Sequence, residues 1–73
     1  MKKEVPALLS NNIKEYRVKK QLTQQQLADL VNVSSRTIIS LEKGQYNPSV
    51  LLAYELAKIF GLKIEELFNF EEG

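Results

Sequence analysis

The stretch LTQQQLADLVNVSSRTIISLEKG, from Leu22 to Gly44, predicts two short helices joined by a tight turn. Thr23 is followed three residues later by Gln26, which is the S/T-x-x-E/Q spacing of a capping box. The first helix of the pair is therefore expected to begin directly after Thr23. Ser34 is a good cap for the second helix, and Gly44 suits the left-handed position at which helices commonly end.

The residues between these caps meet the packing needs of two crossing helices. Ala28 supplies the small side chain that a close crossing requires, and Asn32 tolerates the left-handed conformation of a tight turn. Val33 is expected to be buried and to fix the angle between the helices, with Ile38 and Leu41 facing the core. The outward face of the second helix then carries Ser35, Arg36, Ser40 and Lys43. Residues 24–43 are thus predicted to form a helix-turn-helix.

Further helices are expected on both sides of this pair. The first, about 12–20, would be capped by Asn11 or Asn12 and turn Ile13 and Tyr16 inward. The second helix of the pair is expected over 35–43. The helices after it are expected over 50–60, between the cap Ser49 and the stop Gly61, and over 64–68. The inward face of the helix after Thr23 is expected to consist of Leu27, Ala28, Leu30 and Val31.

The two chain ends have weak strand character. Residues 4–9 and 68–71 could pair as a small ribbon, in which Pro6 would confine its strand to an edge, or they could be frayed ends. The expected fold class is all-α, with five helices and this ribbon as an added element. The expected organisation is an N-terminal segment 1–10, a helix-turn-helix domain 11–68 and a tail 69–73.

Composition excludes several functional classes. The chain has 73 residues, enough for one domain, and contains neither Cys nor His. It therefore lacks disulfides, the usual zinc ligands and the commonest catalytic bases and nucleophiles, so an enzyme is the poorest hypothesis and no metal or cofactor is expected. No apolar run is long enough to span a membrane, and no secretory signal follows Met1, so a cytoplasmic location is expected. No pocket for a small-molecule ligand is evident.

Charge is unevenly divided along the chain. Residues 1–43 hold eight basic and four acidic side chains, a net +4, whereas residues 44–73 hold two basic and five acidic ones, a net −3. The overall charge of +1 therefore hides a basic half that could meet a polyanion.

The same residues resemble the phage repressor and Cro family, also called the Xre family. Leu22-Thr23-Gln24, Val33-Ser34, Thr37-Ile38, Glu42-Lys43-Gly44 and Asn47-Pro48-Ser49 fall in its register, and the likeness covers roughly residues 12–68. The chain looks most like the small stand-alone dimeric members. The resemblance implies a regulator that binds double-stranded DNA and needs no cofactor.

The resemblance also implies roles for individual residues. The helix over 35–43 would lie in the major groove. Base contacts would come from Ser35, Arg36, Thr37 and Ser40, and DNA-backbone contacts from Gln24, Ser34, Lys43 and Asn47. Arg17 and Glu42 match an ion pair that ties the first helix to the third. The short Ser40 departs from the long side chain common there, which puts more of the specificity on Arg36. Lys63 stands where a Ser, Thr or Asp cap is more common, so fraying of the last helix is expected.

A homodimer is expected because the helix over 50–60 has more apolar surface than one buried stripe needs. The candidate interface residues are Ile59, Leu62, Ile64 and Phe68. A two-fold dimer would place two recognition helices on successive major grooves of a palindromic operator. We expect such a regulator to act as a repressor. The alternative is an antitoxin or other protein-interaction module of the same fold.

Overall fold

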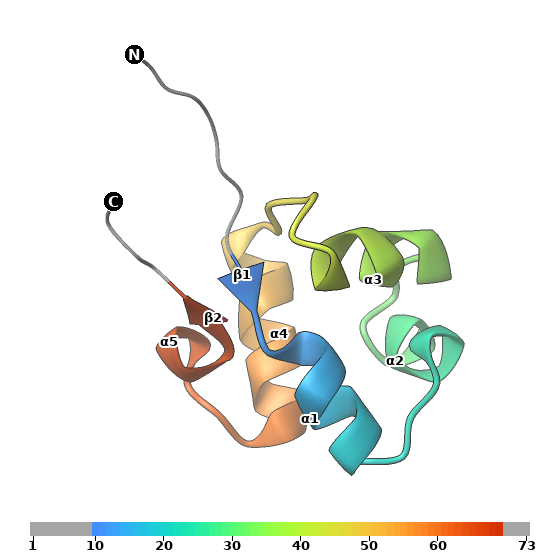
Figure 1. Cartoon of the computed structure of the whole chain (residues 1–73), viewed down its shortest axis with the longest axis horizontal. Coiled ribbons are helices and arrows are strands. Elements are labelled where there is room, and N and C mark those ends of the chain that lie inside the picture. Colours follow the sequence, from blue (N-terminus) through green and yellow to red (C-terminus); the bar gives the residue numbers. More distant parts are fainter. Residues whose placement is uncertain (1–9, 70–73) are drawn as a thin grey trace.

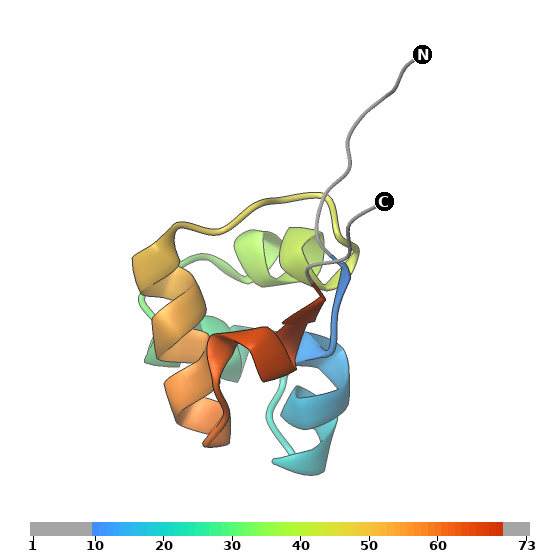
Figure 2. The same ribbon diagram turned by 90° about the vertical axis from the view of Figure 1, so that its left-hand side faces the viewer.

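A computed structural model describes residues 10–69 and arranges five short helices around one apolar core (Figure 1). The elements are β1 (Ser10–Asn11), α1 (Ile13–Lys19), α2 (Gln24–Leu30), α3 (Ser35–Glu42), α4 (Val50–Phe60), α5 (Ile64–Leu67) and β2 (Phe68–Asn69). α2 and α3 lie on one side of α1 and α4, and α5 with the two strands lies on the other (Figures 1 and 2). The predicted all-α class, the five helices and a terminal ribbon are confirmed.

The first four helices end in the same way, with a left-handed residue. These residues are Gln21 (φ 60°), Asn32 (φ 60°), Gly44 (φ 71°) and Gly61 (φ 69°). After each one, the next backbone N–H donates to a carbonyl five residues earlier, as from Leu22 to Arg17 at 3.1 Å. Such bonds satisfy carbonyls that the helix end would otherwise leave without partners. The sequence predicted this role for Asn32, Gly44 and Gly61 but not for Gln21.

Helix starts also follow the predicted caps, with two differences. The Thr23–Gln26 capping box forms, and the hydroxyls of Ser34 and Ser49 each accept from the N–H three residues on. Asn12 precedes α1 but makes no capping hydrogen bond through its side chain, so its expected role is wrong. At α5, the Glu66 carboxylate accepts from the Lys63 N–H at 2.8 Å and so supports a helix start that lacks a good cap.

The described part of the terminal ribbon consists of Ser10–Asn11 and Phe68–Asn69. β1 and β2 run antiparallel, with Ser10 opposite Asn69 and Asn11 opposite Phe68. Residues 4–9 and 70–71, which were expected to take part, lie outside the described residues. Asn11, expected as a helix cap, lies in β1, and its side chain does accept from the N–H of Ile13, the first residue of α1. Phe68, expected at the end of the last helix, is extended and belongs to β2.

The core is apolar and lies where the helices meet. It consists of Ile13, Leu27, Ala28, Val31, Ile38, Leu41, Ala53, Leu56, Ala57, Leu67 and Phe68. The prediction that Leu30 faces inward is wrong, since its side chain is 59% exposed. Leu30 lies about 100° around α2 from its neighbour Val31, and Leu27, Ala28 and Val31 define the buried side. Val33 is half-buried against the core rather than fully buried.

Candidate nucleic-acid interface

α2 and α3 are held together by a tight turn and a small crossing residue. Ala28 on α2 is fully buried, and its backbone carbonyl accepts from the Val33 N–H at 3.0 Å across the turn. Asn32 adopts the positive φ that this turn requires. The helix-turn-helix predicted over 24–43 therefore forms through the residues expected to form it, and it leaves one face of α3 open.

The open face of α3 carries a basic stripe. Arg36, Ser40 and Lys43 lie at i, i+4 and i+7, opposite the fully buried Ile38 and Leu41. Arg36 and Lys43 are exposed and Ser40 is half-buried. The stripe therefore presents two cations with a small hydroxyl between them, which suits close approach to a polyanion. We call these three residues the α3 stripe.

The other predicted contact residues are arranged around this stripe. Ser35 and Thr37 are half-buried on the first turn of α3, and Asn47 is exposed in the loop before α4. The Ser34 hydroxyl accepts from the Thr37 N–H at 3.2 Å and lies 3.1 Å from the Thr37 hydroxyl. The two hydroxyls thus hold each other at the start of the helix.

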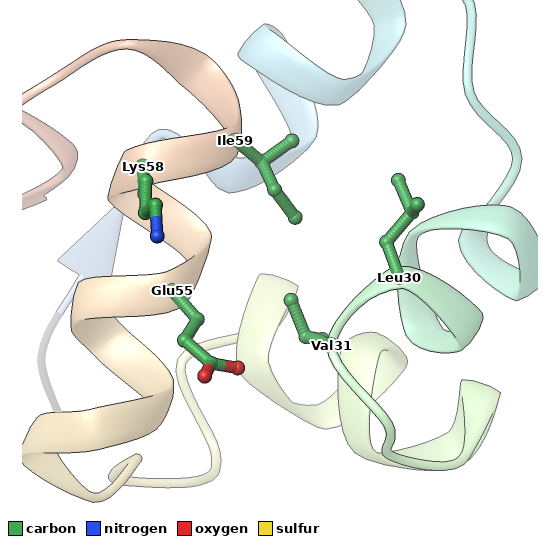
Figure 3. A pocket seen from close by; sticks show the side chains of 5 residues that line it. All are labelled: Leu30, Val31, Glu55, Lys58 and Ile59. Atoms are coloured by element: carbon green, nitrogen blue, oxygen red, sulfur yellow. The ribbon is translucent and has the colours of Figure 1, made fainter.

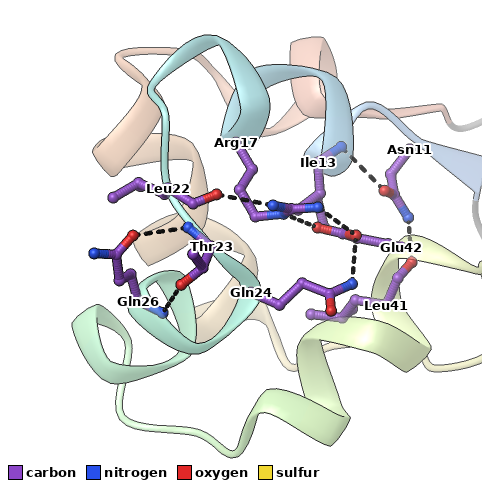
Figure 4. Close-up of polar contacts among 9 residues, drawn as sticks. All are labelled: Asn11, Ile13, Arg17, Leu22, Thr23, Gln24, Gln26, Leu41 and Glu42. Atoms are coloured by element: carbon purple, nitrogen blue, oxygen red, sulfur yellow. Dashed lines mark hydrogen bonds and ion pairs between the residues drawn. The ribbon is translucent and has the colours of Figure 1, made fainter.

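A carboxylate joins three helices behind the stripe (Figure 4). Arg17 on α1 donates from Nε to Oε2 of Glu42 on α3 at 2.6 Å and from Nη2 to Oε1 at 3.3 Å. Its Nη1 also donates to the Leu22 carbonyl at 2.8 Å. The two charged side chains are only 11% and 6% exposed, so the predicted ion pair is confirmed as a largely buried one.

Gln24 on α2 completes this cluster, which the sequence did not predict. Its Nε2 donates to Glu42 Oε1 at 3.1 Å (Figure 4). The amide that we expected at a DNA phosphate is therefore engaged inside the protein. Glu42 receives hydrogen bonds from both α1 and α2, and this fixes the end of α3 against both helices.

Asn11 combines the contact with the start of α1 that the sequence predicted with a contact to α3 that the sequence did not predict. Its Nδ2 donates to the Leu41 carbonyl at 2.7 Å, and its Oδ1 accepts from the Ile13 N–H at 3.1 Å (Figure 4). Asn11 thus ties β1 both to the start of α1 and to the end of α3. The only sequence signal was an Asn before a helix, which indicates a cap and not a contact 30 residues away.

The predicted dimer residues offer little surface. Phe68 is 1% exposed, so its assignment to an interface is wrong: it fills the core beneath the ribbon. Ile59, Leu62 and Ile64 are half-buried and pack against the core. The large exposed apolar side chains of the described residues are Val18, Leu30, Tyr46, Val50, Leu51 and Tyr54.

A shallow groove separates the end of α2 from α4 (Figure 3). It is lined by Leu30, Val31, Glu55, Lys58 and Ile59. Within residues 10–69, no helix is long and apolar enough to cross a membrane.

Known proteins are similar to this chain in sequence and in fold. The helix-turn-helix family model HTH_3 matches residues 13–67. An uncharacterised HTH-type transcriptional regulator of Archaeoglobus fulgidus is 50% identical over 64 residues, which are 88% of this chain and 90% of that protein. The cryptic phage CTXphi transcriptional repressor RstR of Vibrio cholerae is 32% identical over 65 residues, 89% of this chain and 59% of RstR. The crystal structure of the restriction-modification controller protein C.AhdI from Aeromonas hydrophila superposes with a TM-score of 0.67 at 29% identity, over 75% of this chain and 80% of that one.

Proposed function

The chain belongs to the helix-turn-helix family, and we propose that it is a transcriptional regulator that binds operator DNA as a homodimer and represses the promoter it covers. The family consists of DNA-binding regulators and not of enzymes. RstR is a transcriptional repressor that is 32% identical to this chain, and this supports repression as the direction of regulation. Binding to promoter DNA agrees with the cytoplasmic location that the sequence predicts.

The observation that carries this proposal is the α3 stripe over a buried scaffold. Arg36 and Lys43 are exposed on one face, while the opposite face and the Glu42 cluster fix the helix against α1 and α2. A rigid helix with a cationic outer face can enter the major groove, which is wide enough to admit it. Because α3 is already fixed, only its exposed side chains need to become ordered when DNA binds.

The contacts divide into two kinds by their chemistry. Arg36 and Ser40, with Ser35 and Thr37, would reach base edges, and the Arg36 guanidinium can donate two parallel hydrogen bonds to a guanine. Lys43 and Asn47, with Ser34, would hold phosphates and set the register without reading sequence. Two copies on a palindrome would cover the promoter and exclude the polymerase sterically, without a cofactor.

Selection of bound duplexes from a random pool tests this proposal. The expected product is an inverted repeat whose half-sites lie about 34 Å apart, one turn of the double helix. Enrichment of a single unrepeated motif would contradict the dimeric operator, and no enrichment would contradict sequence-specific binding. Transcription from a promoter that contains the selected repeat then gives the sign of regulation: less transcript in the presence of the protein supports repression.

A further inference from the structure

The start of α4 exposes more apolar surface than any other described part of the chain. Val50 is 80% exposed, Leu51 66% and Tyr54 52%, and Tyr46 in the loop directly before α4 is 44% exposed. On α4, Leu51 and Tyr54 face away from the buried Ala53, Leu56 and Ala57, whereas Val50 lies on the same side as Ala53 and Ala57 and is exposed because it begins the helix. We call these four residues the α4 patch. Two other exposed apolar side chains, Val18 and Leu30, belong to α1 and α2.

The four residues of the α4 patch are themselves uncharged, and the Lys58 ammonium lies at the edge of the patch, 5.8 Å from the centroid of the Tyr54 ring. Residues 44–54 form the longest uncharged stretch of the sequence, in a chain with 26% charged residues. A two-fold interface brings the same surface of both copies together, so a charge near the axis would meet its own like charge. An uncharged centre that includes two tyrosines therefore suits a second copy of this chain, since interface centres are depleted in charge and enriched in aromatic residues.

The edges of the stretch fit the same partner. Lys43 precedes it and Glu55 follows it, so its two ends carry opposite charges. When two copies meet about a two-fold axis through the middle of the stretch, the basic end of one faces the acidic end of the other. This arrangement places a pair of opposite charges at the rim on each side of the two-fold axis and leaves the centre uncharged.

The place of the patch in the fold supports this occupant as well. The loop that contains Tyr46 leaves the end of α3 and leads into α4 (Figure 2). A two-fold axis at this point keeps the two α3 helices close to the axis, as two adjacent half-sites on one face of DNA require. We propose that the α4 patch is the dimer interface, which replaces the predicted residues Ile59, Leu62, Ile64 and Phe68. The proposal names the surface for the dimer of the proposed function and rests on it.

Sedimentation velocity of the full chain without DNA tests the interface. Leu51→Glu places an acid in the first turn of α4, where the helix dipole favours it, so the fold is expected to survive. Val18→Glu is the matched control, because Val18 is 56% exposed on α1. We expect dimers for the wild type and Val18→Glu, and monomers for Leu51→Glu at the same micromolar concentrations. Dimers of Leu51→Glu, or equal dissociation of both variants, would overturn the proposal, as would a monomeric wild type.

A label experiment keeps the test valid if Leu51→Glu unfolds. The chain has no cysteine, so Glu55→Cys and Val18→Cys each give one site for a nitroxide spin label. Glu55 lies at the edge of the patch, and the distance between the two labels of a dimer should be shorter at position 55 than at position 18. The reverse order would overturn the proposed interface.

DNA binding separates this inference from the proposed function. If the wild type selects an operator and Leu51→Glu dimerises as the wild type does, the interface is wrong while the function stands. If the wild type forms the expected dimer but selects no DNA sequence, the function is wrong while the interface stands.

Discussion

Arg17 on α1 and Glu42 on α3, 25 residues apart in sequence, form a two-pronged ion pair that is largely closed off from water. Glu42 lies one residue before Lys43 and is the last residue of α3, the helix that carries the α3 stripe. A guanidinium that makes two hydrogen bonds to one carboxylate fixes both the distance and the angle between the helices. The stability of the domain and the orientation of α3 thus depend on the same two side chains.

Glu42→Ala should destabilise the fold strongly. It leaves the Arg17 guanidinium buried with only its bond to the Leu22 carbonyl, and breaking a buried pair in this way costs about 3 kcal/mol. Urea unfolding at a fixed protein concentration measures the loss. Arg17→Met with Glu42→Ala should cost less than the two single changes added together, because the double variant contains neither unpaired charge.

Lys19→Met is the control for that experiment. Lys19 and Glu15 are 3.8 Å apart on α1, but their side chains are 63% and 60% exposed. Loss of this exposed pair should change the free energy of unfolding by less than about 0.5 kcal/mol. Equal effects of Lys19→Met and Glu42→Ala would contradict a structural role for the buried pair.

Gln21→Gly should stabilise the protein. Gln21 has a φ of 60°, a conformation that costs a residue with a Cβ roughly 1–2 kcal/mol and costs glycine almost nothing. The greater freedom of glycine in the unfolded chain removes part of this gain, so a net increase of about 0.5–1 kcal/mol is expected. The midpoint of urea unfolding measures it. Lys20→Gly, at a residue with φ −86°, gains no such relief and should destabilise the fold.

The parts of the fold that could be predicted from sequence depend on local chemistry. The bounds of α4 follow from Ser49 and Gly61, and the capping box of α2 follows from two side chains three residues apart. The ion pair of Arg17 and Glu42 required the family resemblance, because nothing in local spacing relates α1 to α3.

The features that were missed depend on distant contacts or on unusual backbone. Asn11 reaches a carbonyl 30 residues away and Gln24 a carboxylate 18 residues away, and no local pattern specifies either partner. Gln21 is forced into a left-handed conformation that its residue type does not indicate. The assignment of Phe68 to the interface was wrong because the sequence pattern does not distinguish an exposed apolar residue from one that fills the core, as Phe68 does.

Lys43→Gln should weaken binding to all duplexes alike. Lys43 is exposed at the end of α3, where a phosphate contact releases counterions but reads no base. The slope of log affinity against log salt should fall by about 1 for each half-site occupied. Titrations over a salt series on the selected operator and on an unrelated duplex measure this effect. Lys63→Gln, which removes the same charge before α5, should leave both slopes unchanged; an unchanged slope for Lys43→Gln would remove that residue from the DNA interface.

Arg36→Ala should lower affinity for the selected operator by about 1–3 kcal/mol and relax the base preference at one position of each half-site. The exposed guanidinium near the start of α3 is the longest cationic group on the α3 stripe, and its two parallel donors suit a guanine edge. Arg36→Lys separates charge from geometry, because lysine keeps the positive charge but lacks the planar pair of donors. We expect Arg36→Lys to retain the salt dependence of the wild type and to lose most of the base preference. Repeating the duplex selection with each variant measures that preference, and an unaltered motif from Arg36→Ala would mean that another face of the domain reads the DNA.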